Sequence, residues 1–219
     1  MQSESMEPNW AADHLQVIRT LMERSAVYRR ALAPMMLWAG ALGTAAGAAG
    51  LLWPVDHPVR FILFWLAIAL VTMTGSFLMV RRQALREAEP FWSPPARRVV
   101  RAAAPAAACG LGLALVIGAH LLGEAGDSSL WRLMTFQMLP VIWAGLYGCG
   151  MHAAGFFMPR GMRWFGTGMV AVALVLLAAG NPGLEPFQWG HGVMAICFGL
   201  LHLGYGAYLV STERPHAAL

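Results

Sequence analysis

The sequence predicts an all-α integral membrane bundle of six transmembrane helices, because it is apolar throughout and divides into six long apolar stretches. The chain has 219 residues, of which 58% are hydrophobic and 12% are charged. This charge content is about half that of an ordinary soluble domain. A water-soluble core cannot hide so much apolar surface, and six spans of about 20 residues use most of the length. We therefore expect one lipid-embedded bundle and no separate soluble domain.

The six apolar stretches are separated by short, proline-containing segments. Their approximate bounds are 32–53, 60–80, 99–121, 133–154, 162–180 and 189–210. Proline is expected in the gaps because it lacks an N–H group and tends to mark a helix boundary. The predicted organisation is an N-terminal segment at 1–31, a transmembrane domain at 32–210 and a tail at 211–219.

The arginines predict the orientation of the bundle. All 15 basic residues are arginine, and they are divided unequally between the two sides of the predicted membrane. One side carries Arg19, Arg24, Arg29, Arg30, Arg81, Arg82, Arg86, Arg97, Arg98, Arg101, Arg160, Arg163 and Arg214. The other side has only Arg60 and Arg132. The positive-inside rule then places both termini in the cytoplasm of a bacterial-type inner membrane.

The segment before the first span has the pattern of an amphipathic helix at the membrane interface. It lacks an apolar run next to a basic start, so it is not predicted to be a signal peptide. Apolar and small residues recur there at helical spacing, at Leu15, Ile18, Leu21, Met22, Ser25 and Tyr28. The plain interpretation is an interfacial helix. The alternative is a docking surface for a cytoplasmic protein, with Glu23, Arg24, Arg29 and Arg30 as the candidate contacts.

Two pairs of spans resemble each other. Residues 38–50 read WAGALGTAAGAAG and residues 143–155 read WAGLYGCGMHAAG, while 109–121 resembles 197–209 more weakly. A true repeat would make a 3+3 inverted repeat, the architecture of many transporters. The alternative is coincidence, because Ala, Gly and Leu dominate these helices. Within the first stretch, Gly43 and Gly47 form a GxxxG step, which favours close packing inside the bundle over a homo-oligomer interface.

The predicted spans contain no acidic residue, since all 11 lie outside them. This disfavours carboxylate proton relays and carboxylate metal cages, because intramembrane carboxylates usually mark such sites. The polar side chains that remain are the candidate ligand or pathway residues: His202, His191, Gln137, Tyr205, Tyr147, His152 and His120. His191, His202 and Tyr205 follow helical spacing on the sixth stretch. We call the predicted polar contact between the fourth and sixth stretches the polar seam.

Three interpretations of the histidines stay open: hydrogen bonds that fix helix register, a pathway for a small solute or ion, and ligation of haem or a metal. The leading functional hypothesis is transport or binding of a small solute or ion through the polar seam. The alternatives are a non-catalytic membrane partner of a cytoplasmic protein and a haem- or metal-binding redox protein. No catalytic residue is proposed, because GxSxG and HExxH motifs are absent. The scattered arginines argue against nucleic-acid binding, and the lipid bilayer is the expected partner.

Overall fold

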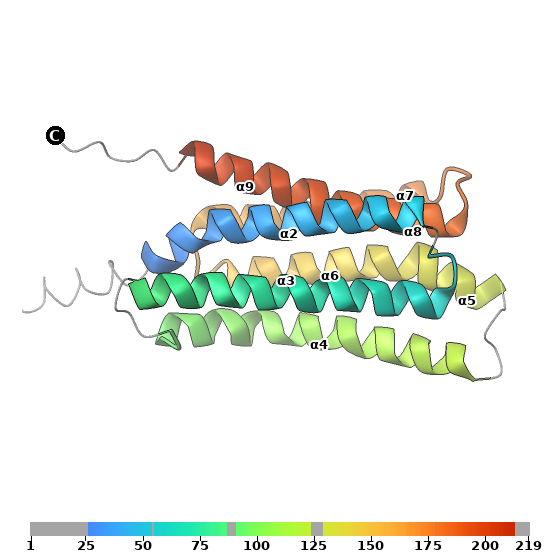
Figure 1. Cartoon of the computed structure of the whole chain (residues 1–219), viewed down its shortest axis with the longest axis horizontal. Coiled ribbons are helices and arrows are strands. Elements are labelled where there is room, and N and C mark those ends of the chain that lie inside the picture. Colours follow the sequence, from blue (N-terminus) through green and yellow to red (C-terminus); the bar gives the residue numbers. More distant parts are fainter. Residues whose placement is uncertain (1–25, 54, 87–90, 124–128, 213–219) are drawn as a thin grey trace, which may run out of the picture.

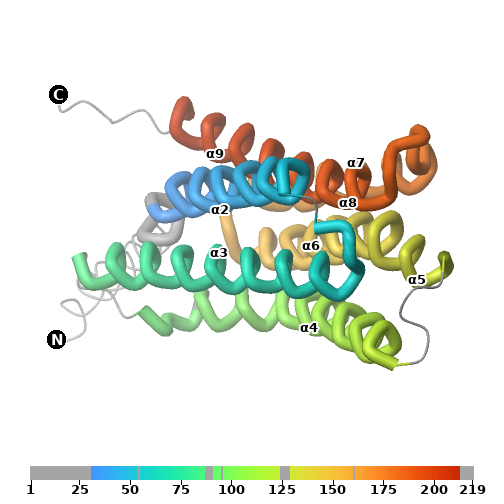
Figure 2. The backbone as a smooth tube through the Cα atoms, turned by 45° about the vertical axis from the view of Figure 1, so that its right-hand side comes forward, coloured from blue at the N-terminus to red at the C-terminus, as the bar shows by residue number. Residues whose placement is uncertain are grey.

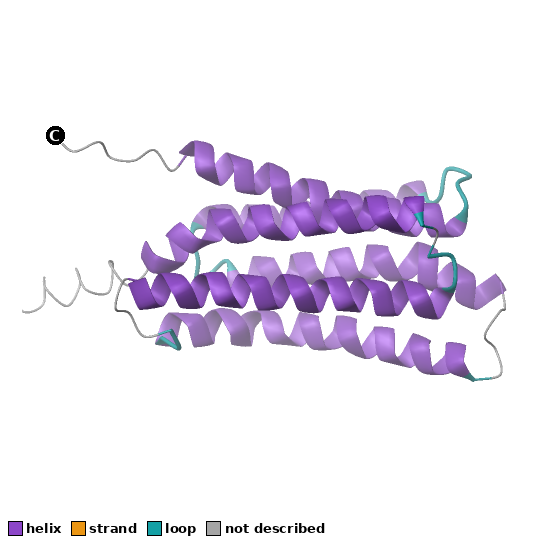
Figure 3. Ribbon diagram, in the orientation of Figure 1, coloured by secondary structure: helices purple, strands orange, loops and turns teal. Residues whose placement is uncertain are grey.

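The computed structural model describes residues 26–53, 55–86, 91–123 and 129–212, and the regular elements of this part are all helical (Figure 3). The elements are α2 (Ala26–Leu52), α3 (Pro58–Arg86), α4 (Pro94–Leu122), α5 (Ser129–Leu133), η1 (Met134–Met138), α6 (Leu139–Ala154), α7 (Arg160–Ala179), α8 (Pro186–Met194), η2 (Ala195–Leu200) and α9 (Leu201–Thr212). The elements η1 and η2 are π-helical. The long helices run side by side along the longest axis of the molecule (Figure 1).

Six helices of the described part are long and apolar enough to cross a membrane. They are Ala31–Leu52, Pro58–Arg86, Ala96–Leu122, Ser129–Ala154, Gly161–Ala179 and Pro186–Thr212, numbered here as spans 1 to 6. The predicted number of spans is confirmed, and most predicted bounds lie within a few residues of these. Span 2 is longer than predicted, because its helix continues through three arginines to Arg86. The helices therefore indicate a polytopic, multi-pass membrane protein in contact with lipid.

Span 4 lies at the centre of the bundle. In its most apolar stretch 50% of the residues are buried, compared with 17% in the corresponding stretches of spans 2 and 3. Its helix α6 packs between α7 and α4, while α2 packs against α3 and against η2 and α9. The contact of η1 with α8 joins these two groups of helices. Figure 2 shows α3 and α4 lying side by side at the edge of the bundle.

Span 1 approaches span 6 closely because its facing residues are glycines. A Cβ atom on Gly43 would overlap the backbone carbonyl of Phe198, and one on Gly47 would overlap Ala195. Only glycine, which has no Cβ atom, allows the two backbones to come this close at these positions. The GxxxG step thus packs inside the chain, as predicted.

The π-helical segments interrupt spans 4 and 6, the two spans of the predicted polar seam. A π turn holds one residue more than an α turn. Successive residues of an α-helix are related by a rotation of about 100° about the helix axis. The extra residue of a π turn therefore rotates the side chains that follow it by about this angle, compared with an uninterrupted α-helix. The side chains of span 6 before and after η2 consequently meet different neighbours.

The structure leaves the predicted inverted repeat unconfirmed, because two equivalent tryptophans have different neighbours. The repeat pairs span 1 with span 4, and spans 2 and 3 with spans 5 and 6. Trp38 of span 1 lies against Gly75 of span 2, whereas its counterpart Trp143 in span 4 donates a 2.9 Å hydrogen bond to the Gly110 carbonyl of span 3. These neighbours are not equivalent under the repeat, which stays a prediction.

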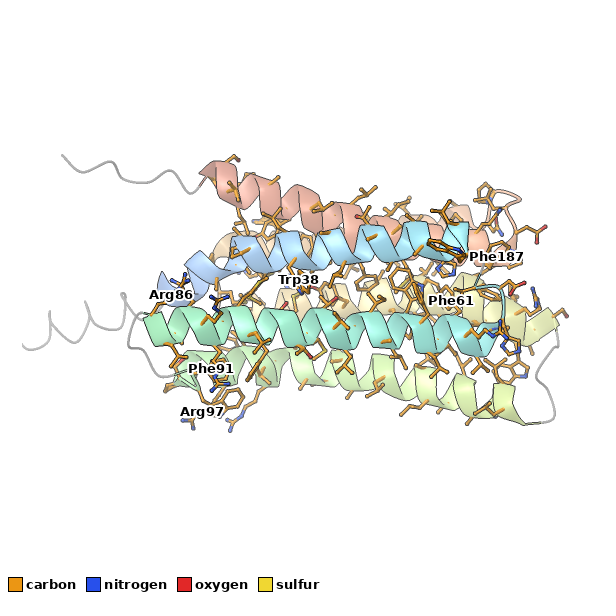
Figure 4. All side chains as sticks on the ribbon, viewed as in Figure 1. Trp38, Phe61, Arg86, Phe91, Arg97 and Phe187 are labelled. Atoms are coloured by element: carbon orange, nitrogen blue, oxygen red, sulfur yellow. The ribbon has the colours of Figure 1, made fainter. Side chains whose placement is uncertain are left out.

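The described arginines lie at the ends of the bundle, and mostly at one end. Arg86 and Arg97 share that end, and Phe61 and Phe187 mark the opposite one (Figure 4). The predicted interfacial helix falls largely on residues outside the described part, as do Glu23 and Arg24. Arg29 and Arg30 lie near the start of α2. The docking surface therefore stays a prediction.

Candidate functional site

The first polar cluster joins spans 4 and 6 in the half of the bundle near the arginine-rich end. His202 is buried, and its Nδ1 lies 3.0 Å from the carbonyl oxygen of Cys197. Because a carbonyl only accepts, Nδ1 carries the proton and donates it. The other ring nitrogen, Nε2, then accepts a 2.8 Å hydrogen bond from the Tyr147 hydroxyl. This assignment is that of a neutral imidazole, because a charge on a ring buried in the bundle would be costly, and both nitrogens are occupied.

Tyr205 extends this cluster toward span 5. Its ring stacks on Phe165 with centroids 4.7 Å apart, and the same Phe165 ring meets His202 edge-on at 5.0 Å. The Tyr205 hydroxyl is buried and has no hydrogen-bond partner within the described residues. Gly161 lies directly beside that oxygen, where a Cβ atom would come within 2.8 Å of it. We call His202, Tyr147 and Tyr205 the inner cluster.

The second polar cluster surrounds His191 near the other end of the bundle. Trp65 of span 2 donates its Nε1–H to His191 Nδ1 at 3.2 Å, so that nitrogen is the acceptor. His191 Nε2 carries the proton and donates to the Val55 carbonyl at 3.4 Å. The ring of Phe61 packs edge-on against this imidazole at 4.9 Å. The protonated nitrogen is thus the opposite one from that of His202.

The two buried histidines do not face the same helix, although regular helical spacing places them on one face. His191 contacts spans 1 and 2, where a Cβ atom on Gly50 would overlap its ring. His202 contacts Tyr147 of span 4 and Phe165 of span 5. The π-helical segment η2 lies between them and rotates the second histidine away from the first.

The π-helical segment of span 4 carries polar side chains at the level of His191. The carbonyl oxygen of Phe136, within η1, lies 2.8 Å from where a Cβ atom on Gly190 would stand. Next to Phe136, the side chain of Thr135 is fully buried, and its hydroxyl has no partner in the part of the chain that the structure describes. The half-buried Gln137 follows in the same segment. We call Thr135, Gln137 and His191 the outer group.

An apolar layer separates the outer group from the inner cluster. Val141 and Ala144 of span 4 pack with Val193 and Cys197 of span 6 and with residues of span 5. These positions fall between Gln137 and Tyr147 along span 4, and between the two histidines along span 6. The polar seam is therefore closed at its middle by small apolar side chains.

His120 and His152 lie apart from both clusters, on the exposed surface of the bundle. His120 stacks on Trp131 with centroids 4.9 Å apart, and its Nδ1 lies 2.8 Å from the Val116 carbonyl of its own helix. His152 Nδ1 lies 2.9 Å from the Thr167 hydroxyl of span 5. Neither imidazole points into the contact between spans 4 and 6. Instead, His120 bonds to the preceding turn of its own helix and His152 bonds to span 5.

The described residues contain no group of three or more His, Cys, Asp or Glu side chains that could hold a metal ion. In His191 and His202 the lone-pair nitrogen already accepts a hydrogen bond from Trp65 or Tyr147. A metal or haem iron would have to displace that donor before either histidine could bind it. The buried histidines are therefore arranged as hydrogen-bonding groups.

Sequence reasoning did not identify Trp65, Thr135 or Phe165. Trp65 carried a usable signal, because an indole N–H within a long apolar stretch needs an acceptor and neutral imidazole is one. Thr135 stands out only after η1 is known, since threonine in an α-helix can bond its own backbone. Phe165 has no signal in an apolar sequence.

Comparisons with protein-family models, curated proteins and solved structures find no match to this chain.

Proposed function

We propose that the protein binds a small, uncharged, hydrogen-bonding solute between spans 4 and 6 and passes it across the membrane. The observation that carries this proposal is an unpartnered hydroxyl at each side of the apolar layer: Thr135 in the outer group and Tyr205 in the inner cluster. A buried hydroxyl without a partner costs about 1–3 kcal/mol. A solute that supplies the missing bond recovers that free energy.

The chemistry of the seam favours an uncharged solute over an ion. Spans 4 and 6 contain no acidic residue, so no carboxylate balances a cation. The inner cluster has neutral imidazole and phenol groups, which both donate and accept hydrogen bonds. A charged solute would cross the apolar layer of Val141, Ala144, Val193 and Cys197 at a much higher free-energy cost than a neutral one.

The π-helical segments support movement at the same place. Such segments are rare and frequently lie at functional sites, where the local hydrogen bonding can rearrange. Here η1 lies on the outer side of the apolar layer in span 4, and η2 contains Cys197 of that layer in span 6. Rotation of one segment by a residue would move the small side chains of the layer apart without breaking a regular helix.

The arginine distribution supports the orientation of the pathway. We infer that the end carrying Arg86 and Arg97 faces the cytoplasm of a bacterial-type inner membrane, because the opposite end of the described part has only Arg60 and Arg132. The inner cluster would then open toward the cytoplasm and the outer group toward the other side.

The test is uptake of neutral solutes by proteoliposomes. Vesicles mixed with hyperosmotic urea, glycerol or erythritol shrink and then re-swell as solute enters, which light scattering follows. We expect faster re-swelling with at least one solute than in protein-free vesicles, and loss of that difference in His202→Ala and Gln137→Ala. The matched control is His120→Ala, whose exposed imidazole lies outside the seam. Re-swelling no faster than in protein-free vesicles, or unaffected by both seam variants, contradicts the proposal.

A further inference from the structure

Six exposed arginines gather at the end of the bundle where spans 2 and 3 meet. They are Arg81, Arg82 and Arg86 at the end of α3, and Arg97, Arg98 and Arg101 at the start of α4. These helices pack side by side and run in opposite directions, so both sets lie at one end (Figure 1). Figure 4 shows Arg86 and Arg97 there. We call these six residues the arginine patch.

The charge of the arginine patch is not balanced within the described part of the chain. The acidic residues there are Asp56 and Glu185, and both lie in segments at the opposite end. Arg82 and Arg86 are four residues apart on α3, so like charges stand one turn apart, which is unfavourable. The connecting segment adds two glutamates in the sequence, Glu87 and Glu89, and six positive minus two negative charges leave a net charge of +4.

Aromatic side chains place this end at the level of lipid headgroups. The ring of Phe91 packs edge-on against Phe77 at 4.9 Å, and Trp92 stacks on Phe91 at 6.4 Å. Trp92 is 53% exposed, and the neighbouring Leu85 is 71% exposed. Exposed tryptophan beside apolar helix surface is typical of the boundary between hydrocarbon and headgroups. Arg97 is held at this level by a 3.4 Å hydrogen bond from its Nε to the Trp92 carbonyl.

The side chains, rather than the start of helix α4, supply the donors for an anion. Pro94 and Pro95 have no N–H group, and the Ala96 N–H is directed at Ser93 Oγ at 3.5 Å. The backbone therefore offers few unpaired N–H groups. Guanidinium groups instead present paired N–H donors that match the oxygens of a phosphate.

We propose that the arginine patch binds the phosphate groups of anionic phospholipids in the leaflet that it faces. Lipid fits better than a protein partner, because the charged groups stand directly above exposed apolar helix surface. The lipid-facing side of α3 continues from Leu85 through Leu78 to Phe77, which are all exposed. One phospholipid satisfies both surfaces, with acyl chains along α3 and its phosphate among the guanidinium groups.

Native mass spectrometry of the purified protein tests this proposal. The detergent micelles contain equal amounts of phosphatidylglycerol and phosphatidylcholine with the same acyl chains, and the retained lipids are counted. We expect several-fold preference for phosphatidylglycerol, which decreases as ammonium acetate is raised because salt screens the contacts. Equal retention of the two lipids by the wild-type protein would overturn the proposal.

A pair of variants distinguishes lipid binding by the arginine patch from a general effect of the positive charge of the protein. Arg82→Gln combined with Arg101→Gln should remove most of this preference, because each arginine near an anionic surface contributes up to about fivefold. Lysine at the same two positions should keep most of the preference, which also shows that the bundle tolerates substitution there. The matched control is Arg60→Gln at the opposite end, which should leave the preference unchanged. If the glutamine variant retained the same preference for phosphatidylglycerol as the wild-type protein, the assignment of the arginine patch as the lipid site would be refuted.

Discussion

The hydrogen bond between Tyr147 and His202 makes the sharpest prediction about the core. Replacing Tyr147 by Phe removes a 2.8 Å bond and leaves His202 Nε2 buried without a donor. Such a loss costs about 1–3 kcal/mol in soluble proteins, whereas interhelical bonds in membranes average about 0.6 and reach about 1.7 kcal/mol. Since His202 is only 2% exposed, lipid or water is a poor substitute. We therefore expect Tyr147→Phe to lower the free energy of unfolding by about 1–2 kcal/mol.

A double-mutant cycle isolates this bond from the packing around it. His202→Leu also deprives the Cys197 carbonyl of its 3.0 Å partner, so it should cost more than Tyr147→Phe. The double variant should be more stable than the sum of the single losses implies, by about 1 kcal/mol, because both single variants remove the same bond. Unfolding by SDS in mixed micelles measures all four proteins. Tyr208→Phe, at a ring that is 57% exposed, is the control. Strict additivity of the two substitutions would refute the assigned bond.

Three further predictions concern other contacts and use the same unfolding assay. Gly43→Ala should cost about 1–3 kcal/mol because its Cβ would overlap the backbone of span 6, whereas Gly112→Ala, with open space around it, should cost nothing; equal effects would contradict the close packing. Trp65→Phe should cost about 1 kcal/mol by leaving His191 Nδ1 without its donor, and unchanged stability would argue against that bond. Thr135→Val removes an unpartnered hydroxyl and should leave the protein as stable or more so, while abolishing neutral-solute uptake. A clear loss of stability in that variant would mean that the hydroxyl already has a partner.

The spans were predictable because they depend on local composition. About 20 apolar residues are needed to cross the hydrocarbon, and each span meets that condition without reference to its neighbours. The boundaries were less predictable where arginine extends a helix beyond the apolar run. Span 2 ends at Arg86 rather than near residue 80, because a long arginine side chain reaches the interface while its helix continues.

The candidate residues were identified by type, but their surroundings were not predictable. In a soluble helix, polar residues mark the outer face, whereas a lipid-facing surface is as apolar as the interior of a bundle. His120 and His202 therefore look alike in the sequence, although the first is exposed and the second is buried against Tyr147. The π-helical segments added a second difficulty, because regular helical spacing carried across η2 assigns His191 and His202 to one face.

The placement of charge and hydrogen bonding favours the proposed neutral solute over a proton or a cation. Charged groups of the described part lie near the ends of its helices, and the buried histidines bond to neighbouring helices in two opposite arrangements, with Trp65 at Nδ1 of His191 and Tyr147 at Nε2 of His202. A protein that moved protons or cations through the seam would need polar groups at its middle, where Val141, Ala144, Val193 and Cys197 pack with apolar residues of span 5. The unpartnered hydroxyls of Thr135 and Tyr205 instead stand on either side of that layer, where a neutral solute could bond to each in turn.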